Sequence, residues 1–166
     1  MIRYAVKRLE ARIADSELGD LLGPEVSLVP APRSAPMVPG GLWPAERIRE
    51  ALVAAGLGRE VLRCLERVTP VEKSATALPG ERPSAEEHYE SIRARGGLRL
   101  AGARAVVVDD VITKGATCLA SGGPLSEVFR DTDIRAFALV RTLGLVGEMP
   151  VLGRVEHRLG RIDRSP

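Results

Sequence analysis

Two adjacent carboxylates at the end of an apolar run are the residues of this sequence best suited to chemistry. Asp109 and Asp110 follow directly on Val106, Val107 and Val108. Ionised carboxylates beside an apolar core are costly unless hydrogen-bond donors or a cation compensate them. An ionised aspartate only accepts hydrogen bonds, so the vicinal hydroxyls of a ribose would be suitable donors. The pair therefore predicts a site for a sugar.

The segment after the acidic pair is suited to binding phosphate. It consists of Thr113, Lys114, Gly115, Ala116 and Thr117. These residues supply two hydroxyls, a conformationally free glycine and backbone N–H groups at the start of a predicted helix, where the helix dipole favours an anion. A sugar held by the two acids would place its phosphate on this helix. The spacing therefore fits a ribose 5-phosphate.

The elements that must position these residues alternate between strands and helices. Apolar runs predict buried strands at 26–29, 103–110 and 134–140, and a weaker edge strand at 154–159. The run at 61–68 fits a helix or a strand, and the loop that follows it at once favours a strand. Amphipathic segments predict helices at 3–18, from 44 to about 56–58, at 84–95 and from about 117, with a break or cap near 122–124. This alternation predicts an α/β fold with a mainly parallel central sheet flanked by helices. Ligands of such sheets bind beyond the carboxyl ends of the strands, which points to loops 30–41 and 110–117.

Residues 106–117 (VVVDDVITKGAT) resemble the signature of the type I phosphoribosyltransferases, in which apolar residues lead into two acids, an apolar pair and a Thr/Gly-rich phosphate loop. The departure is Lys114, where the family has threonine, and a longer cation there adds a phosphate contact or crowds the loop. The resemblance extends more thinly over 26–141. It is closest to ComF-like and amidophosphoribosyltransferase-like members, whose short proline-containing loop is similar to Ala31–Ser34. The alternative for the acidic segment is a strand that ends in a solvated turn.

The resemblance implies a reaction at the ribose C1 of phosphoribosyl pyrophosphate (PRPP). A nitrogen nucleophile would displace pyrophosphate, with magnesium bound mainly through substrate oxygens and water. Asp109 and Asp110 would hold the ribose hydroxyls and stabilise the positive charge that develops on the sugar. Residues 113–117 would hold the 5-phosphate. Arg33, whose planar fork suits phosphate oxygens, and Ser34 would hold the pyrophosphate, unless this loop is only a proline-stiffened surface turn.

The resemblance also gives a role to the loop Thr69–Pro83, which occupies the position of the family's mobile lid. Lys73, as a catalytic residue, and Arg82, as a substrate-binding residue, are its candidate phosphate clamps. Closure of such a lid excludes water from a reactive sugar cation. The alternative is an ordinary solvated loop. Outside these segments, His88 is predicted to be a surface or capping residue and Cys118 a small buried packing residue.

Length and composition limit the number of domains and exclude some classes of protein. The 166 residues suit one domain, 1–166, with a core at about 26–141 and, by the resemblance, hood segments at 1–22 and 142–166 that bind the second substrate. The net charge of +2 comes from 24 basic and 22 acidic residues mixed along the chain, which argues against a dedicated nucleic-acid binder. No apolar stretch approaches the roughly 18 residues of a membrane span. Because the sequence shows no apolar leader and its two cysteines lie far apart, we expect a cytoplasmic protein. The resemblance implies a homodimer.

The identity of the acceptor is not encoded in any recognisable pattern, so a second class of function stays open. Some proteins with this fold keep the PRPP site but serve as non-catalytic sensors or regulatory modules. Turnover separates the two, because a sensor binds PRPP without releasing pyrophosphate to any acceptor. A third interpretation, a receiver-like phosphate-binding domain, needs a lysine after a later strand. Here Arg141 and Thr142 follow the predicted strand 134–140, so this interpretation is disfavoured.

Overall fold

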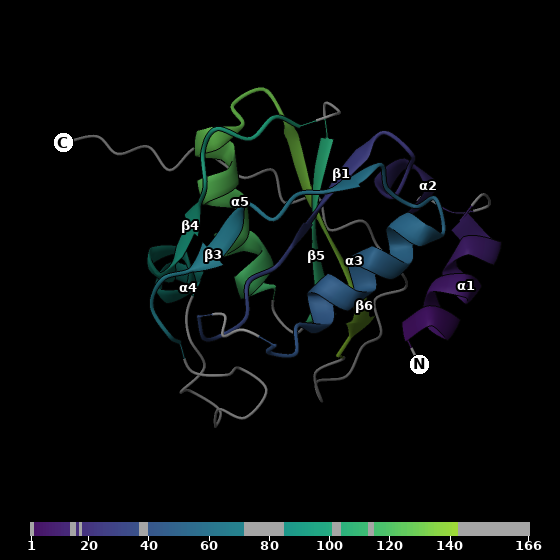
Figure 1. The fold of residues 1–166 in the computed structure, drawn as a ribbon, viewed down its shortest axis with the longest axis horizontal. Coiled ribbons are helices and arrows are strands. Elements are labelled where there is room, and N and C mark those ends of the chain that lie inside the picture. Colours follow the sequence, from purple (N-terminus) through teal and green to yellow (C-terminus); the bar gives the residue numbers. More distant parts are fainter. Residues whose placement is uncertain are drawn as a thin grey trace, which may run out of the picture.

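The structure, a computed structural model, describes residues 2–13, 16, 18–36, 40–71, 85–100, 104–112 and 115–142. Within these residues, four strands form a parallel sheet in the order β2-β1-β5-β6 (Figure 1). The strands are β1 (Val26–Pro30), β2 (Glu60–Val61), β5 (Arg104–Ile112) and β6 (Asp133–Arg141). The predicted α/β fold with a parallel central sheet flanked by helices is confirmed.

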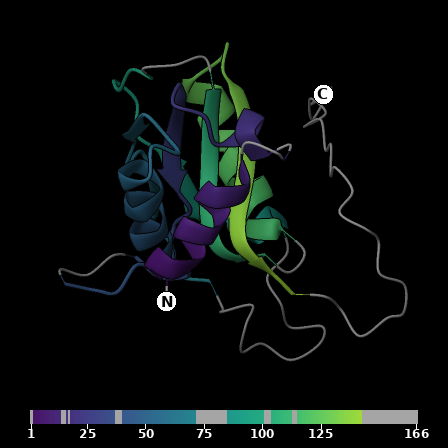
Figure 2. The same ribbon diagram turned by 90° about the vertical axis from the view of Figure 1, so that its right-hand side faces the viewer.

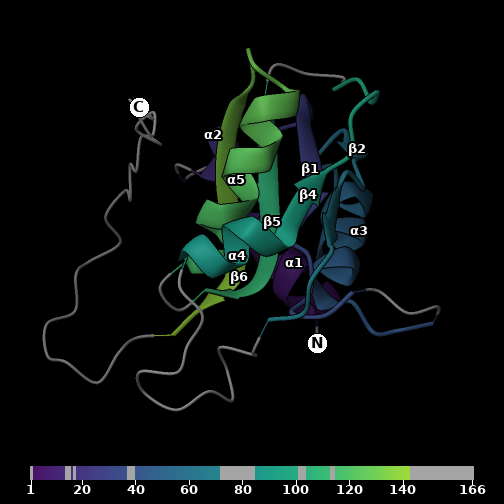
Figure 3. The ribbon, with the colours of Figure 1, turned by 90° about the vertical axis from the view of Figure 1, so that its left-hand side faces the viewer.

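Helices cover both faces of the sheet. On one face lie α1 (Ile2–Ile13), the short α2 (Leu18–Leu21) and α3 (Pro44–Ala54), and on the other lie α4 (Ala85–Ser91) and α5 (Ala116–Val128). Figure 2 shows α3 and α5 on opposite sides of the strands, and Figure 3 shows α4 packed beside α5. No helix in the described part of the chain is both long and apolar enough to span a membrane.

The strand β5 divides the interior into two cores, because successive side chains of a strand point to opposite faces. Ala105 and Val107 belong to the core beneath α5, whereas Val106 and Val108 belong to the core beneath α3. All four side chains are buried. This two-sided burial explains why the run is apolar throughout, as expected for a central strand of a parallel sheet.

The order of the strands places a topological switch point between β1 and β5. The chain adds β2 on one side of β1 and then adds β5 and β6 on the other side. Ligands of open α/β sheets bind at such a switch point, outside the carboxyl ends of the strands. Pro30, the last residue of β1, pairs with Val108. The strand β5 therefore continues past the end of β1, and its extension begins with the acidic pair.

The predicted strand 61–68 is two short strands in different sheets. The chain leaves the central sheet after β2, and β3 (Leu65–Arg67) pairs antiparallel with β4 (Ile92–Ala94). The strand β4 also shortens the helix predicted at 84–95, which ends at Ser91. Ile92 is fully buried and Arg93 is exposed, so these residues follow the twofold alternation of a strand. The helix predicted at 3–18 ends at Ile13, and the edge strand predicted at 154–159 lies outside the described residues.

The break predicted near 122–124 does not occur, because α5 continues through Gly122, Gly123 and Pro124. Close packing against α4 explains the glycine at position 123. A Cβ atom added to Gly123 would lie 2.3 Å from Cε2 of Tyr89, whose hydroxyl donates a 2.8 Å hydrogen bond to Glu127 of α5. Contact between the two helices thus requires a residue without a side chain at this point.

We expect Gly123→Ala to lower the free energy of unfolding by about 1–3 kcal/mol through overpacking against Tyr89. Helix propensity alone would raise it by about 1 kcal/mol. Chemical denaturation of the variant and the wild type measures the difference. Gly96→Ala is the matched control, because a Cβ atom there meets nothing within 4 Å. A stabilised Gly123→Ala protein would show that α4 does not pack as closely as described.

Candidate functional site

The acidic pair lies within β5, not in a loop after it, because the strand continues to Ile112. Strand alternation places Asp109 on the α5 face of the sheet and Asp110 on the α3 face. Each carboxylate accepts a local hydrogen bond. The Asp110 N–H donates to Asp109 Oδ1 at 2.9 Å, and the Val111 N–H donates to Asp110 Oδ1 at 2.9 Å. The two acids, equivalent in the sequence, therefore have different surroundings.

Asp109 is the more perturbed of the two acids. Burial raises the pKa of its carboxyl to about 7, while the hydrogen bond from the Asp110 N–H and the positive charge of Arg67 act in the opposite direction. Cys118 Sγ lies 4.0 Å from Asp109 Oδ2, and burial raises the pKa of this thiol, so it stays protonated. The prediction that Cys118 is a small buried residue is confirmed. Near neutral pH, the Asp109 carboxyl is thus poised between its two protonation states, and hydroxyl donors would favour the ionised one.

The first turn of α5 presents free backbone donors to the same edge of the sheet. Gly115 occupies the N-cap position with a φ of 79°, and no side chain among the described residues caps the helix there. The first bond of the helix runs from the Leu119 N–H to the Gly115 carbonyl at 2.9 Å. The positive φ explains the glycine, since other residues adopt this conformation only with strain. An uncapped helix start of this kind is able to bind an anion.

The loop after β1 is tied to β5 and to α3. The Ala31 N–H donates to the Val108 carbonyl at 2.8 Å, which continues the pairing of the two strands by one residue. Trp43, at the N-cap position of α3, donates from its indole Nε1 to the Ala31 carbonyl at 2.8 Å. These bonds fix the start of the loop beside Asp109, because Val108 directly precedes that acid.

Arg33 and Ser34 of this loop are held by Arg67 of β3 and by Val71, which follows that strand. Arg67 Nε donates to the Arg33 carbonyl, and the Val71 N–H donates to the Ser34 carbonyl at 2.7 Å. Both side chains are half-buried, and no described residue pairs with the Arg33 guanidinium. The structure therefore brings Arg33 and Ser34 to the carboxyl edge of the sheet, where the acidic pair and the start of α5 also lie.

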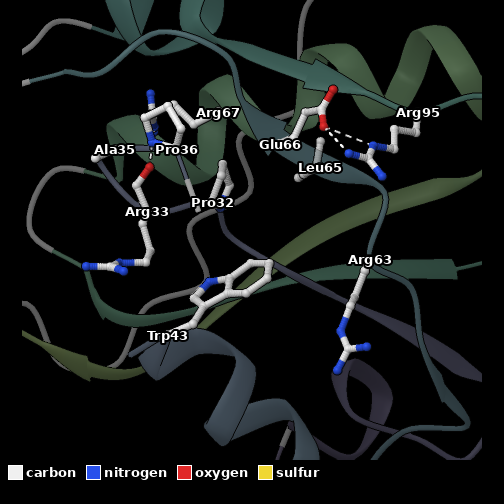
Figure 4. Close-up of a pocket in the computed structure, with 10 residues that line it drawn as sticks. All are labelled: Pro32, Arg33, Ala35, Pro36, Trp43, Arg63, Leu65, Glu66, Arg67 and Arg95. Atoms are coloured by element: carbon white, nitrogen blue, oxygen red, sulfur yellow. Dashed lines mark hydrogen bonds and ion pairs between the residues drawn. The ribbon is translucent and has the colours of Figure 1, made fainter. Parts of the chain in front are cut away.

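A pocket of about 310 Å³ opens beside this loop, and its lining is rich in positive charge. Its charged lining residues are Arg33, Arg63, Arg67, Arg95 and Glu66. Arg95 pairs with Glu66, and Arg63 pairs with Glu46 outside the pocket. Figure 4 shows Arg33 and Arg63 on either side of Trp43, with a hydrogen bond from Arg67 to the Arg33 carbonyl. The excess of cations suits the pocket to an anionic group.

Arg67 is the residue of this site that sequence reasoning missed. Its side chain is 5% exposed, and burial lowers its pKa to about 10, while the charge of Asp109 raises it. Besides the bond to the loop after β1, Nη1 donates to Ser91 Oγ, and Nη2 lies 3.2 Å from His88 Nδ1. One signal was present in the sequence: Arg67 is two residues from the buried Leu65, and so lies on the same face of the strand.

The prediction that His88 is a surface or capping residue is wrong. Its side chain is 3% exposed, because α4 turns it inward onto Arg67. A guanidinium only donates hydrogen bonds, so His88 Nδ1 accepts and the proton of the neutral ring is on Nε2. Burial and the charge of Arg67 lower the pKa of His88, which keeps the ring neutral. Within the described part of the chain, Nε2 has no hydrogen-bond partner.

Several predicted site residues lie outside the described residues. These are Lys73, Arg82, Thr113 and Lys114. Of the predicted lid Thr69–Pro83, the structure describes only residues 69–71. Gly115, Ala116 and Thr117 are described and lie at the start of α5, where all three are half-buried. The roles of all these residues remain predictions.

Among known proteins, similarity to this chain is found in solved structures. No family model matches the chain, and no curated protein is similar to it. Among solved structures, the chain is similar to adenine phosphoribosyltransferase from Saccharomyces cerevisiae, complexed with D-2,5-dideoxy-2,5-imino-altritol 1,6-bisphosphate and adenine. The identity is 20% over 82% of this chain and 68% of that chain, with a TM-score of 0.45. This similarity assigns no role to any residue of the present chain.

Proposed function

We propose that the protein is a phosphoribosyltransferase of the type I family that binds PRPP and transfers its phosphoribosyl group to a nitrogen nucleophile, with release of pyrophosphate. One observation carries the proposal. Two acids, a helix start that no described side chain caps and a loop whose arginine pairs with no described residue lie at the carboxyl edge of a parallel sheet, at its switch point. These three features match the hydroxyls, the 5-phosphate and the diphosphate of a single substrate.

Each feature takes one part of PRPP. Asp109 and Asp110 accept hydrogen bonds from the ribose hydroxyls, and their charge stabilises the positive charge on the sugar as the bond from C1 to pyrophosphate lengthens. The backbone N–H groups at the start of α5 hold the 5-phosphate, together with Thr113 and Lys114. Arg33 and Ser34 hold the pyrophosphate, for which the pocket beside them has room.

A magnesium ion fits this arrangement as a companion of the diphosphate. Magnesium prefers oxygen ligands and retains several waters, so diphosphate oxygens and water would supply most of its ligands. Any ligand from the protein would be a carboxylate oxygen of the acidic pair. The bound ion would neutralise charge on the leaving pyrophosphate. Lys73 and Arg82 are proposed to add positive charge over the same group.

A pyrophosphate-release assay tests this function. Purified protein is supplied with PRPP, magnesium and a panel of nucleobases and amines, and pyrophosphate is measured with and without each acceptor. Release that depends on one acceptor, and that is lost in Asp109→Asn, is the expected result. Tight binding of PRPP with no release for any acceptor would instead identify a PRPP sensor. Failure to bind PRPP would exclude both functions.

A further inference from the structure

Three segments far apart in the sequence meet at one buried guanidinium. Arg67 donates to the Arg33 carbonyl of the loop after β1 and to Ser91 of α4, and it contacts His88 of the same helix. Its charge also acts on Asp109 of β5. A buried cation is costly unless hydrogen bonds and opposite charge compensate it. The hydrogen bonds of Arg67 therefore indicate a structural role in fixing the groups that it contacts.

We propose that Arg67 is a positioning residue. It fixes the backbone of the loop after β1 so that Arg33 points toward the anion, and His88 and Ser91 hold Arg67 in place. Because the anion concerned is the pyrophosphate of PRPP, the proposal rests on the proposed function. It differs from a direct role in binding, since the Arg67 side chain is 5% exposed and its three nitrogens already have partners within the protein.

The geometry explains why arginine is needed at this position. Three acceptors, a backbone carbonyl, a hydroxyl and an imidazole, lie around separate nitrogens of one planar group. Lysine carries the same charge on a single nitrogen and does not reproduce this fork. None of the three acceptors carries a charge, whereas the negative charge of Asp109 raises the pKa of Arg67. Arg67 thus holds the loop that presents Arg33 through hydrogen bonds, and the charge of the acid that would hold the sugar acts on it.

The acceptor role of His88 follows from the same geometry. Its Nδ1 must accept from Arg67, and protonation of the ring would remove this acceptor and place two cations side by side. An asparagine at this position can present an oxygen near the place of Nδ1, whereas leucine fills the space without an acceptor. His88→Asn and His88→Leu therefore form a matched pair that separates hydrogen bonding from packing.

The affinities for two ligands report separately on the two halves of the site. Magnesium pyrophosphate reports on the loop after β1, and ribose 5-phosphate reports on the acidic pair and α5. We expect Arg67→Lys and His88→Leu each to weaken pyrophosphate binding about 10-fold, with ribose 5-phosphate binding within about twofold of the wild type. We expect His88→Asn to retain most of the pyrophosphate affinity. Equal losses for both probes, or no loss for pyrophosphate, would overturn the positioning role.

Amide hydrogen exchange tests the same claim without any ligand. The Val71 N–H, which donates to the Ser34 carbonyl, is expected to exchange about 10-fold faster in Arg67→Lys and His88→Leu. The Leu119 N–H in α5 is the internal control and is expected to keep its wild-type rate. An unchanged rate at Val71, or the same acceleration at Leu119, would contradict the proposal. If the wild type binds neither PRPP nor pyrophosphate, the proposed function fails, and the exchange rates still decide the role of Arg67.

Discussion

Replacement of both acids, in an Asp109→Asn and Asp110→Asn double variant, is expected to abolish detectable PRPP binding without loss of folded protein. Hydrogen bonds to an ionised carboxylate contribute about 1.5–3 kcal/mol each, so losing two corresponds to a decrease in affinity of at least about 100-fold. Calorimetric titration with PRPP and magnesium measures the change. Asp131→Asn, at an exposed acid in the turn before β6, is the matched control. Unchanged affinity in the double variant would remove these acids from the site.

The same double variant is expected to be more stable than the wild type, by an amount that depends on pH. Burial raises the pKa of Asp109 from 3.8 to about 7 in the folded protein. Between these two pH values, Asp109 is ionised in the unfolded chain but still protonated in the folded protein. The free energy of unfolding of the wild type therefore falls as the pH rises through this window, and above it the loss, or deficit, stays constant. Asparagine has no such deficit. About three pKa units at about 1.4 kcal/mol each predict a gain of up to about 4 kcal/mol at about pH 8, and little gain near pH 4, by chemical denaturation. A gain that is the same at both pH values would contradict the burial of this carboxylate.

Removal of the Arg33 guanidinium, which pairs with no residue that the structure describes, is expected in Arg33→Ala to weaken the binding of PRPP and of pyrophosphate by about 10- to 100-fold. The affinity for ribose 5-phosphate is expected to stay unchanged, because that compound lacks the diphosphate. Titration calorimetry with the three compounds separates these effects. Arg130→Ala controls for the loss of one positive charge, since that exposed arginine follows α5 and lies outside the pocket lining. An equal loss for all three compounds would show that Arg33 does not act on the diphosphate.

The parts of the fold that were predictable are those whose signals are local. The run of three valines before Asp109 indicated a central strand, and β5 occupies that place. The helix predicted from about residue 117 begins at Ala116. The chain around Leu62–Cys64 gave no such signal, because it turns from one sheet to another without glycine or proline. At Gly123 the local signal was misleading, because the glycine serves contact with α4 and does not end the helix.

The candidate site also contains some residues that a local sequence pattern indicates and others that no local pattern indicates. Its acids and the start of α5 are contiguous in the sequence, so their pattern was visible there. The cluster around Arg67 is assembled from side chains and backbone of four separate segments, and no local pattern indicates which charged residues will be buried. His88 was misjudged for this reason, since its burial depends on β3 rather than on its own helix.

The most direct test of whether the carboxyl edge of this sheet is a PRPP site is calorimetric titration of the wild-type protein with PRPP and magnesium. Ribose 5-phosphate and a nucleoside monophosphate are titrated for comparison. We expect PRPP to bind with a dissociation constant on the order of micromolar, and ribose 5-phosphate to bind more weakly because it lacks the diphosphate. Absence of detectable PRPP binding would contradict the proposed site and leave the α/β fold without this function.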